Sequence, residues 1–232
     1  MPHHCHAADW PGLMQAGGWF ASLPPALRSG LLAHAESKSL AAGARLFARG
    51  DACDGLYCVV RGRVRITGAI ATGQEAILAV LEAPHWFGEI ALFDRDVRTH
   101  DAWIDADATL LRVPRAALDA LLAEHPGYWQ HFGRLLAQKL RTVFVALEEQ
   151  LLLPATCRVA RKLASMARGY GAWSGPGRHR VSVSQEQLGL MLSLSRQTVN
   201  QSLKQLERDG AIRCLRGAIE IVDRDRLDAV GG

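Results

Sequence analysis

Hydrogen-bonding side chains of several kinds recur at helical spacing between residues 196 and 204. Arg196, Gln197, Asn200, Gln201 and Lys204 would share the outward face of one helix. Arginine, asparagine and glutamine hydrogen-bond to base edges in the DNA major groove, and lysine contacts phosphates. The pattern therefore predicts a helix that reads DNA.

A buried face on each of two short helices would position this polar face. Apolar residues recur at helical spacing on both sides of a tight turn: Leu188, Met191, Leu192, Leu194, Val199, Leu203 and Leu206. Ser184 and Gln187 form a capping box for the first helix, and Ser195 is a good N-cap for the second. An ordinary helical hairpin with a solvated face is the alternative. The agreement of caps, turn and polar face favours a helix-turn-helix.

The residues around this motif predict a winged version of it. A helix is expected over residues 156–168 and a short strand over 180–183. After the recognition helix, Asp209-Gly210 begins a hairpin whose strands are residues 211–215 and 218–222. We expect this hairpin to form a β-wing beside the helix-turn-helix.

Charge is distributed unevenly along the 232 residues. Residues 155–232 carry 13 Lys/Arg and 7 Asp/Glu, a net charge of +6, whereas residues 1–154 carry 14 and 16, a net charge of −2. This asymmetry is typical of a DNA-binding domain joined to a domain with another task. Five scattered cysteines, no signal-peptide pattern and no apolar run of about 18 residues predict a cytoplasmic protein without a membrane partner.

The first half of the chain changes its pattern twice. Residues 1–18 are interpreted as a flexible leader; the tract His3, His4, Cys5 and His6 is metal-friendly, but a disordered terminus is favoured and no metal site is predicted. Residues 19–36 are expected to be a helical section. Short apolar runs from Leu40 to Pro114, separated by Gly, Asp and Pro, indicate a compact all-β barrel or jelly roll.

A helix over 115–124 precedes a long helix from about Tyr128 to Leu152. Its apolar residues follow steps of four, three, four and four, close to a heptad seam: Leu136, Leu140, Val143, Leu147 and Leu151. We expect these residues to pair with their copies in a homodimer; burial against the barrel of the same chain is the alternative. Pro154 ends the helix and forms a hinge.

Three segments resemble the cyclic-AMP receptor protein / fumarate-nitrate regulator (Crp/Fnr) superfamily of bacterial transcription regulators. They are Gly55–Val64, Phe87–Phe93 followed by Arg98-Thr99, and Ser195–Leu206. The resemblance implies an α+β fold with a cyclic-nucleotide-binding-like β-barrel (jelly roll), a dimerisation helix and a C-terminal winged helix-turn-helix. The expected divisions are 1–18 (leader), 19–127 (effector domain), 128–153 (dimerisation helix) and 154–232 (DNA-binding domain).

The resemblance also implies an effector site. Its residues would be Gly88, Glu89, Ile90, Arg98, Thr99 and His100, together with Val143 and Phe144 of the long helix. Gly88 would let backbone N–H groups approach a phosphate, Glu89 would accept from a ribose hydroxyl, and Arg98 would grip the cyclic phosphate. Alternatively, Glu89 and Arg98 form a structural ion pair inside an empty barrel.

The identity of the effector stays open at this point. His100 stands where cyclic-nucleotide binders tend to have alanine, and Val143 and Phe144 stand where cyclic-AMP binders offer hydroxyls to the purine. The candidates are therefore cyclic AMP, a non-nucleotide effector, haem with Pro2, His85 or His100 as axial partners, or no ligand. Too few cysteines are present near the N-terminus for an iron–sulfur cluster.

The resemblance assigns roles on double-stranded DNA residue by residue. Arg196 is expected to contact guanine and Gln197 adenine, whereas Gln201 replaces an arginine common in relatives. The predicted phosphate contacts are Ser184, Ser195, Thr198 and Lys204. Ser193 replaces a glycine common in the turn, a change expected to cost little if the backbone there is not strongly left-handed. The operator would be an inverted repeat, and RNA polymerase would be a partner.

No nucleophile–base pair or metal-ligand spacing points to an enzyme.

Overall fold

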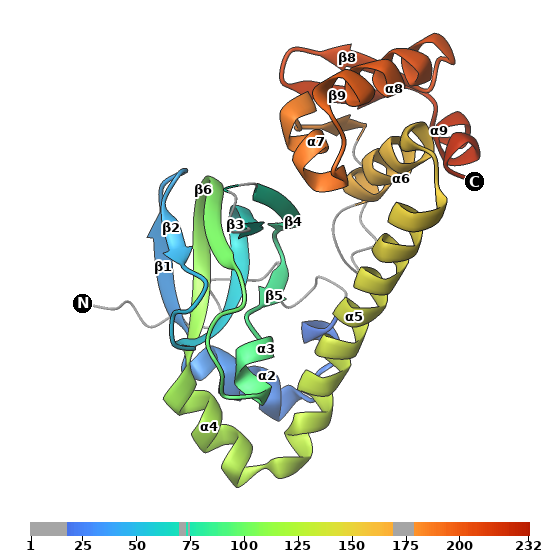
Figure 1. The fold of residues 1–232 in the computed structure, drawn as a ribbon. Coiled ribbons are helices and arrows are strands. Elements are labelled where there is room, and N and C mark those ends of the chain that lie inside the picture. Colours follow the sequence, from blue (N-terminus) through green and yellow to red (C-terminus); the bar gives the residue numbers. More distant parts are fainter. Residues whose placement is uncertain (1–17, 70–72, 74, 169–178) are drawn as a thin grey trace. The chain divides into compact units, whose positions relative to one another are not determined.

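The structure, a computed structural model, describes residues 18–69, 73, 75–168 and 179–232 (Figure 1). The chain divides into two compact units. The first comprises residues up to Gly68 together with Leu78–Leu140, and the second comprises Ala69–Ile77 and Arg141–Gly232. The histidine tract of the predicted leader lies outside the described residues.

An antiparallel six-stranded sheet forms most of the first unit. Its strand order is β1-β6-β3-β4, while β2 also pairs with β6 and β5 pairs with β3. The strands are β1 (Glu36–Leu40), β2 (Arg45–Phe47), β3 (Gly55–Ala69), β4 (Glu75–Glu82), β5 (His85–Phe87) and β6 (Asp101–Pro114). The predicted α+β fold with a jelly-roll-like sheet is therefore confirmed.

Two of these strands are longer than their short apolar runs predicted. In β3 the polar stretch around Gly62 is a register shift against β6 rather than a chain turn. Gly62 has φ +82°, and a Cβ there would lie 2.1 Å from the carbonyl oxygen of Asp107, so only glycine fits this close approach. The irregularity lets β3 continue, and β6 pairs with it on both sides of the shift.

The predicted helical section over residues 19–36 is wrong in its C-terminal part. A short 3-10 turn, η2 (Phe20–Ser22), leads into helix α2 (Pro25–Ala33), which buries Leu27, Leu31 and Leu32. Glu36 already belongs to β1, where it faces Arg112 of β6. The pairing of Glu36 with β6 outweighs the weak helical pattern at the end of the predicted section.

Aromatic side chains fix the start of the long helix to the first unit. Helix α4 (Arg115–Glu124) and turn η3 (Pro126–Tyr128) lead into α5 (Trp129–Leu152). Phe132 is fully buried and packs edge-on against Trp19, which in turn contacts Trp86 of β5. The Trp19 indole also donates to the carbonyl oxygen of His131 at 2.6 Å. The beginning of α5 is therefore joined to the strand that leads into the predicted effector site.

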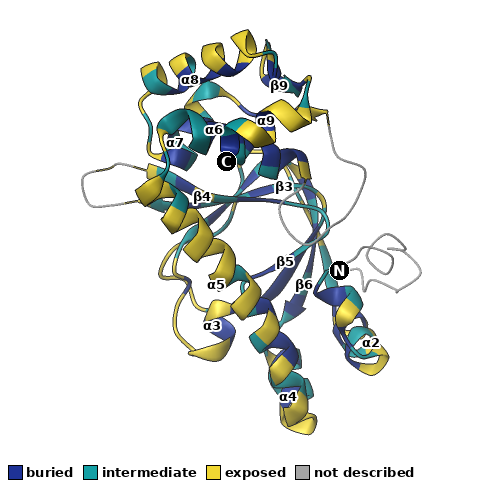
Figure 2. Ribbon diagram, turned by 90° about the vertical axis from the view of Figure 1, so that its right-hand side faces the viewer, coloured by how far each residue is buried: buried dark blue, intermediate teal, exposed yellow. Residues whose placement is uncertain are grey.

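Beyond Leu136, which is half-buried, the predicted seam of α5 is exposed in the single chain (Figure 2). The exposed fractions are 51% for Leu140, 60% for Val143, 51% for Leu147 and 73% for Leu151. The first turns of the helix belong to the core of the first unit, where Phe132 and Leu135 are buried. Within the described part of the chain, no helix has the length and apolar character needed to cross a bilayer.

The second unit contains the predicted winged helix-turn-helix. Its elements after α5 are α6 (Ala155–Arg168), β7 (Arg180–Val181), α7 (Gln185–Leu192), α8 (Arg196–Arg208), β8 (Ile212–Leu215), β9 (Ala218–Ile221) and α9 (Arg224–Gly231). The strand order is β7-β9-β8. One apolar core joins α6, α7, α8 and the wing, with Leu163, Leu188 and Val199 fully buried. Helix α9 was not predicted; Asp223 caps it by accepting from the backbone N–H of Arg226 at 3.0 Å.

Candidate effector site and DNA interface

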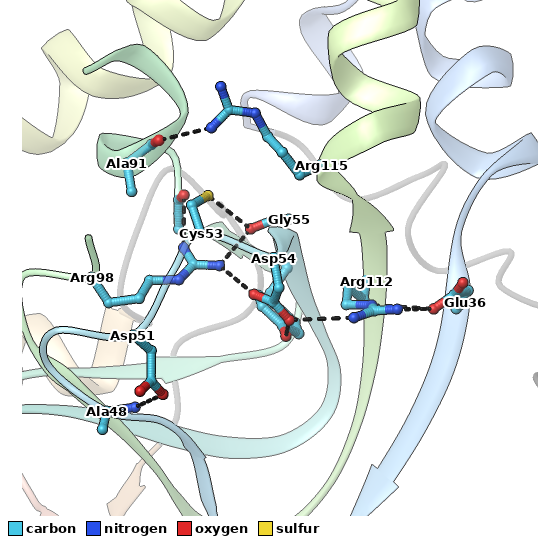
Figure 3. A network of polar contacts seen from close by, with 12 residues as sticks. Glu36, Ala48, Asp51, Cys53, Asp54, Gly55, Ala91, Arg98, Arg112 and Arg115 are labelled. Atoms are coloured by element: carbon cyan, nitrogen blue, oxygen red, sulfur yellow. Dashed lines mark hydrogen bonds and ion pairs between the residues drawn. The ribbon is translucent and has the colours of Figure 1, made fainter. Parts of the chain in front are cut away.

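The guanidinium of Arg98 is the centre of the predicted effector site (Figure 3). Its side chain is buried, with 3% exposed, and lies over the ring of Phe47 at 4.4 Å. Nη1 donates to the carbonyl oxygen of Gly88 at 3.0 Å. Nη2 donates to Asp54 Oδ1 at 2.8 Å and to the carbonyl oxygen of Gly55 at 2.7 Å. The backbone around Arg98 pairs with the turn at residues 50–51, so the side chain is fixed from both ends.

One donor of this buried group has no partner among the described residues: the Nε–H of Arg98. A buried N–H without a hydrogen bond costs about 1–3 kcal/mol, so such groups usually have a partner in the functional state. An anion placed against this edge would supply one. What sets this donor apart is its place in the predicted cassette, beside Gly88 and Gly55.

Glu89 pairs with Lys139 rather than with Arg98, so the alternative of a structural ion pair between Glu89 and Arg98 is wrong. Glu89 is 2% exposed and accepts from Lys139 Nζ of α5 at 2.6 Å. The same ammonium donates to the carbonyl oxygen of Trp86 at 2.8 Å. Burial lowers the pKa of Lys139, and the neighbouring Glu89 opposes this shift. Lys139 thus balances the charge of Glu89 through one carboxylate oxygen, Oε2.

Gly88 allows the close packing of Arg98. It has φ +93°, a conformation that favours glycine, and a Cβ added there would lie 2.7 Å from Arg98 Nη1. Gly43, in a distant turn, has φ +84° but no atom within 4 Å of such a Cβ. Comparing alanine substitutions at these two glycines therefore separates the cost of backbone strain from the cost of contact with Arg98.

Both Gly43→Ala and Gly88→Ala should lose about 1–2 kcal/mol of unfolding free energy through the left-handed backbone. Gly88→Ala should lose a further ~1 kcal/mol, because Arg98 must move away from its buried partners. Urea unfolding of both variants measures the difference. Equal losses would show that Gly88 does not constrain Arg98.

The remaining predicted residues of the cassette lie closer to the surface. Ile90 begins the short helix α3 (Ile90–Phe93) and is 42% exposed. Thr99 is exposed, and its Oγ1 lies 2.9 Å from Nδ1 of His100. The His100 ring reaches toward Gly68 of β3, where its Cδ2 would lie 3.5 Å from an added Cβ. Burial and the charge of Arg49 lower the pKa of His100, so the neutral ring is favoured.

Val143 and Phe144 belong to the second unit and are each 60% exposed. The first unit brings Gly88, Glu89 and Arg98 together, but their relation to these two residues stays a prediction. Sequence reasoning missed Asp54 and Lys139, which supply the partners of Arg98 and Glu89. Both lie about 45–50 residues away in sequence from their partners, and no local pattern marks either of them.

The predicted caps of the helix-turn-helix are present. Ser184 Oγ accepts from the backbone N–H of Gln187 at 3.0 Å, and the Gln187 side chain accepts from the backbone N–H of Ser184 at the same distance. Ser195 Oγ accepts from the backbone N–H of Thr198 at 3.1 Å and also contacts its hydroxyl at 2.8 Å. Both capping hydroxyls are exposed, and the capped helix N-termini are suited to phosphate contacts.

The turn between the helices is left-handed at Ser193, which has φ +52°. The condition for a small cost is therefore not met, because a left-handed non-glycine residue costs about 1–2 kcal/mol. Gly189 makes the tight turn sterically feasible, since a Cβ there would lie 2.9 Å from the carbonyl oxygen of Leu194.

The recognition helix α8 presents the polar face that its spacing predicted. Arg196, Gln197, Gln201 and Lys204 are exposed, while Thr198 and Asn200 are half-buried. Val199, Leu203 and Leu206 are buried on the opposite face. The wing places Arg213 beside Glu220 at 3.1 Å, and Arg216 is exposed at its turn. The helix thus offers the donors and acceptors needed for base edges.

A metal centre does not emerge from the described residues, where no group of three or more His, Cys, Asp or Glu side chains could hold an ion. The cysteines at positions 53, 58, 157 and 214 are free thiols.

Two family models match the chain. Residues 37–125 match the cyclic nucleotide-binding domain, and residues 157–230 match the Crp-like helix-turn-helix domain. These ranges cover the Arg98 cassette and the recognition helix respectively. The class of protein is therefore a DNA-binding transcription regulator with a ligand-binding domain.

Relatives match this chain over most of its length. A "CRP-like cAMP-activated global transcriptional regulator" of Mycobacterium tuberculosis is 28% identical over 217 residues, covering 93% of this chain and 96% of the relative. The crystal structure of Thermus thermophilus catabolite activator protein is 28% identical, with a TM-score of 0.51, and covers 92% of this chain and 97% of that one. The c-di-GMP-responsive regulator CLP of Xanthomonas campestris shares the fold at 22% identity and a TM-score of 0.70, covering 85% and 99%. This chain belongs to the Crp/Fnr family of transcription regulators.

Proposed function

We propose that the protein is a homodimeric regulator that binds cyclic AMP at the Arg98 cassette and then binds an inverted-repeat operator. The observation that carries the proposal is the buried Arg98 guanidinium, whose Nε–H has no partner among the described residues. A guanidinium offers planar donors that match phosphate oxygens. The cyclic-AMP-activated relative of similar length supports this choice among nucleotides.

The surrounding residues would fit the other parts of a nucleotide. Glu89 has one carboxylate oxygen that is not used by Lys139 and would accept from a ribose hydroxyl. Val143 and Phe144 would contact the purine through apolar surface rather than through hydroxyl groups. The loss of one hydrogen bond to the base costs about 1–3 kcal/mol, so recognition would depend mainly on phosphate and ribose.

Cyclic AMP should raise the thermal midpoint of the wild-type protein, and Arg98→Ala should abolish the shift. At a hundred times the dissociation constant, a ligand adds about 2.7 kcal/mol of stability. For a chain of this size, that corresponds to roughly 5–10 °C. The midpoint is measured with cyclic AMP, cyclic GMP and cyclic di-GMP.

Arg98→Lys is the matched control, because it keeps the positive charge but lacks the planar fork. It should retain only part of the shift. The variants' own midpoints will fall because the ion pair with Asp54 is lost, so the relevant quantity is the shift caused by nucleotide. An unchanged shift in Arg98→Ala, or no shift with cyclic AMP in the wild type, would contradict the proposal.

The exposed half of α5 supports a homodimer. Leu140, Val143, Leu147 and Leu151 present a row of large apolar side chains that solvent would otherwise contact. Contiguous apolar surface of this kind marks protein interfaces. We infer that α5 pairs with its copy in a second chain through this row, which would place two recognition helices for two half-sites.

Helix α6 would transmit a change in α5 to the recognition helix. Across the break at Pro154, Arg161 pairs with Glu149 of α5 at 3.2 Å. Arg158 donates to Gln150 Oε1 at 2.6 Å and to the carbonyl oxygen of Leu192, at the end of α7, at 3.2 Å. The hydroxyl of Thr156 donates to the hydroxyl of the buried Ser202 of α8 at 3.2 Å. A ligand would act by favouring one arrangement of this connection over another.

We propose that each of the four predicted parts of the chain has its own role: leader (1–18), effector domain (19–127), dimerisation helix (128–153) and DNA-binding domain (154–232). We further propose that the regulator acts in the cytoplasm, contacts RNA polymerase and performs no catalysis. Base reading by Arg196, Gln197, Asn200 and Gln201 and phosphate contacts by Ser184, Ser195, Thr198 and Lys204 complete the proposal.

A further inference from the structure

Asp54 occupies part of the surface that Arg98 would offer to a phosphate. The Asp54 Oδ1 accepts from Arg98 Nη2 at 2.8 Å, in the centre of the network in Figure 3. The carbonyl oxygen of Gly55 takes the second hydrogen of Nη2 at 2.7 Å. Both forked edges of a guanidinium use a hydrogen of Nη2. Neither edge is therefore free for two-pronged contact with an anion while both bonds are present.

The carboxylate of Asp54 is held in its charged form. Burial opposes ionisation, but hydrogen bonds from Tyr57 and Arg98 outweigh it and lower the pKa of Asp54. Tyr57 Oη donates to Oδ2 at 2.5 Å, and Arg112 Nη1 lies 3.3 Å from the same oxygen. Arg112 is itself fixed by Glu36 at 2.6 Å. Asp54 is thus a charged competitor for any anion at Arg98.

The two partners differ in their freedom to separate. The side chain of Asp54 is 41% exposed, whereas that of Arg98 is 3% exposed. If Asp54 released Nη2, its Oδ2 would keep Tyr57 and Arg112 as donors. Arg98 would then offer Nη2 beside the unpartnered Nε–H, which together form one complete edge of the guanidinium.

We propose that Asp54 is an affinity-setting residue: an internal carboxylate that an anionic effector must replace at Arg98 Nη2. The proposal rests on the proposed function, because it concerns the same cassette. It adds a requirement on the ligand, which must bring two anionic oxygens to one edge of Arg98. A neutral ligand would not replace the carboxylate, so Asp54 would also restrict the class of effector.

Asp54→Asn tests this inference, because the amide keeps the shape of the side chain and removes its charge. Cyclic AMP should bind the full-length variant about tenfold more tightly than the wild type, since a charge-assisted hydrogen bond no longer competes. Isothermal titration calorimetry measures both affinities. Glu36→Gln is the matched control: it removes a carboxylate from the same network without touching Arg98, and its affinity should stay within about twofold of the wild type.

Inorganic phosphate is the second probe, and it separates this inference from the proposed function. If neither protein binds cyclic AMP but Asp54→Asn binds phosphate more tightly than the wild type, the proposed function fails and the inference stands. Equal or weaker binding of both probes by Asp54→Asn overturns the inference, as does an equal gain in Glu36→Gln. Asp54→Ser carries the same test if the asparagine variant does not fold.

Discussion

Replacing Leu147 with glutamate should convert the dimer into a monomer and abolish binding to an inverted-repeat operator. Leu147 is 51% exposed in the single chain and lies in the same row as Leu140, Val143 and Leu151. A charge buried between two helices costs several kcal/mol, and the dimer would contain two such charges. A monomer presents only one recognition helix and loses the contacts of the second half-site. Sedimentation equilibrium and operator binding measure the two effects.

Val145→Glu is the matched control for this variant. It places the same charge on the same helix, in exchange for an apolar residue that is 52% exposed. Two residues along an α-helix correspond to about 200° of rotation, so Val145 faces away from the proposed seam. The control should remain dimeric. A Leu147→Glu protein that sediments as a dimer would place the interface elsewhere.

Arg196→Ala should produce the second large effect, a loss of both affinity and base discrimination. A bidentate contact between arginine and guanine is worth about 1–3 kcal/mol, and a symmetric dimer makes it twice, for roughly 2–6 kcal/mol in total. The operator is first selected from random duplexes with the wild-type protein. Affinities are then measured at one salt concentration for the operator and for duplexes with one base pair changed in each half-site.

Lys204→Ala provides the contrast, because a phosphate contact carries no sequence information. It should weaken binding about equally on all duplexes and reduce the slope of affinity against salt concentration by about one unit per contact. If Arg196→Ala also weakened all duplexes equally, Arg196 would be a phosphate contact rather than a base-reading residue.

The DNA-binding half was predictable because its signals are local. Ser184 and Ser195 cap their helices within three residues, and the buried face of α8 follows from the spacing of Val199, Leu203 and Leu206. Local signals also existed for α9, where Asp223 is an N-cap followed by the buried Leu227. This helix has only eight residues, too few to show a clear apolar period, so it was not predicted.

The effector half was predictable only in outline, because its decisive contacts join distant segments. The cassette spacing singled out Gly88, Glu89 and Arg98 but could not show that Arg98 pairs with Asp54 and Glu89 with Lys139. Asp54 reaches Arg98 because β3 begins beside the cassette, and Lys139 reaches Glu89 because the start of α5 packs on the first unit. Such pairings depend on tertiary packing rather than on any sequence period.

The most direct test of effector gating is the affinity of the wild-type dimer for its selected operator with and without saturating cyclic AMP, at one salt concentration. Cyclic AMP should tighten operator binding by at least about fivefold, and by linkage the operator should tighten cyclic AMP binding by the same factor. An operator affinity that does not respond to cyclic AMP would contradict gating of DNA binding by this nucleotide.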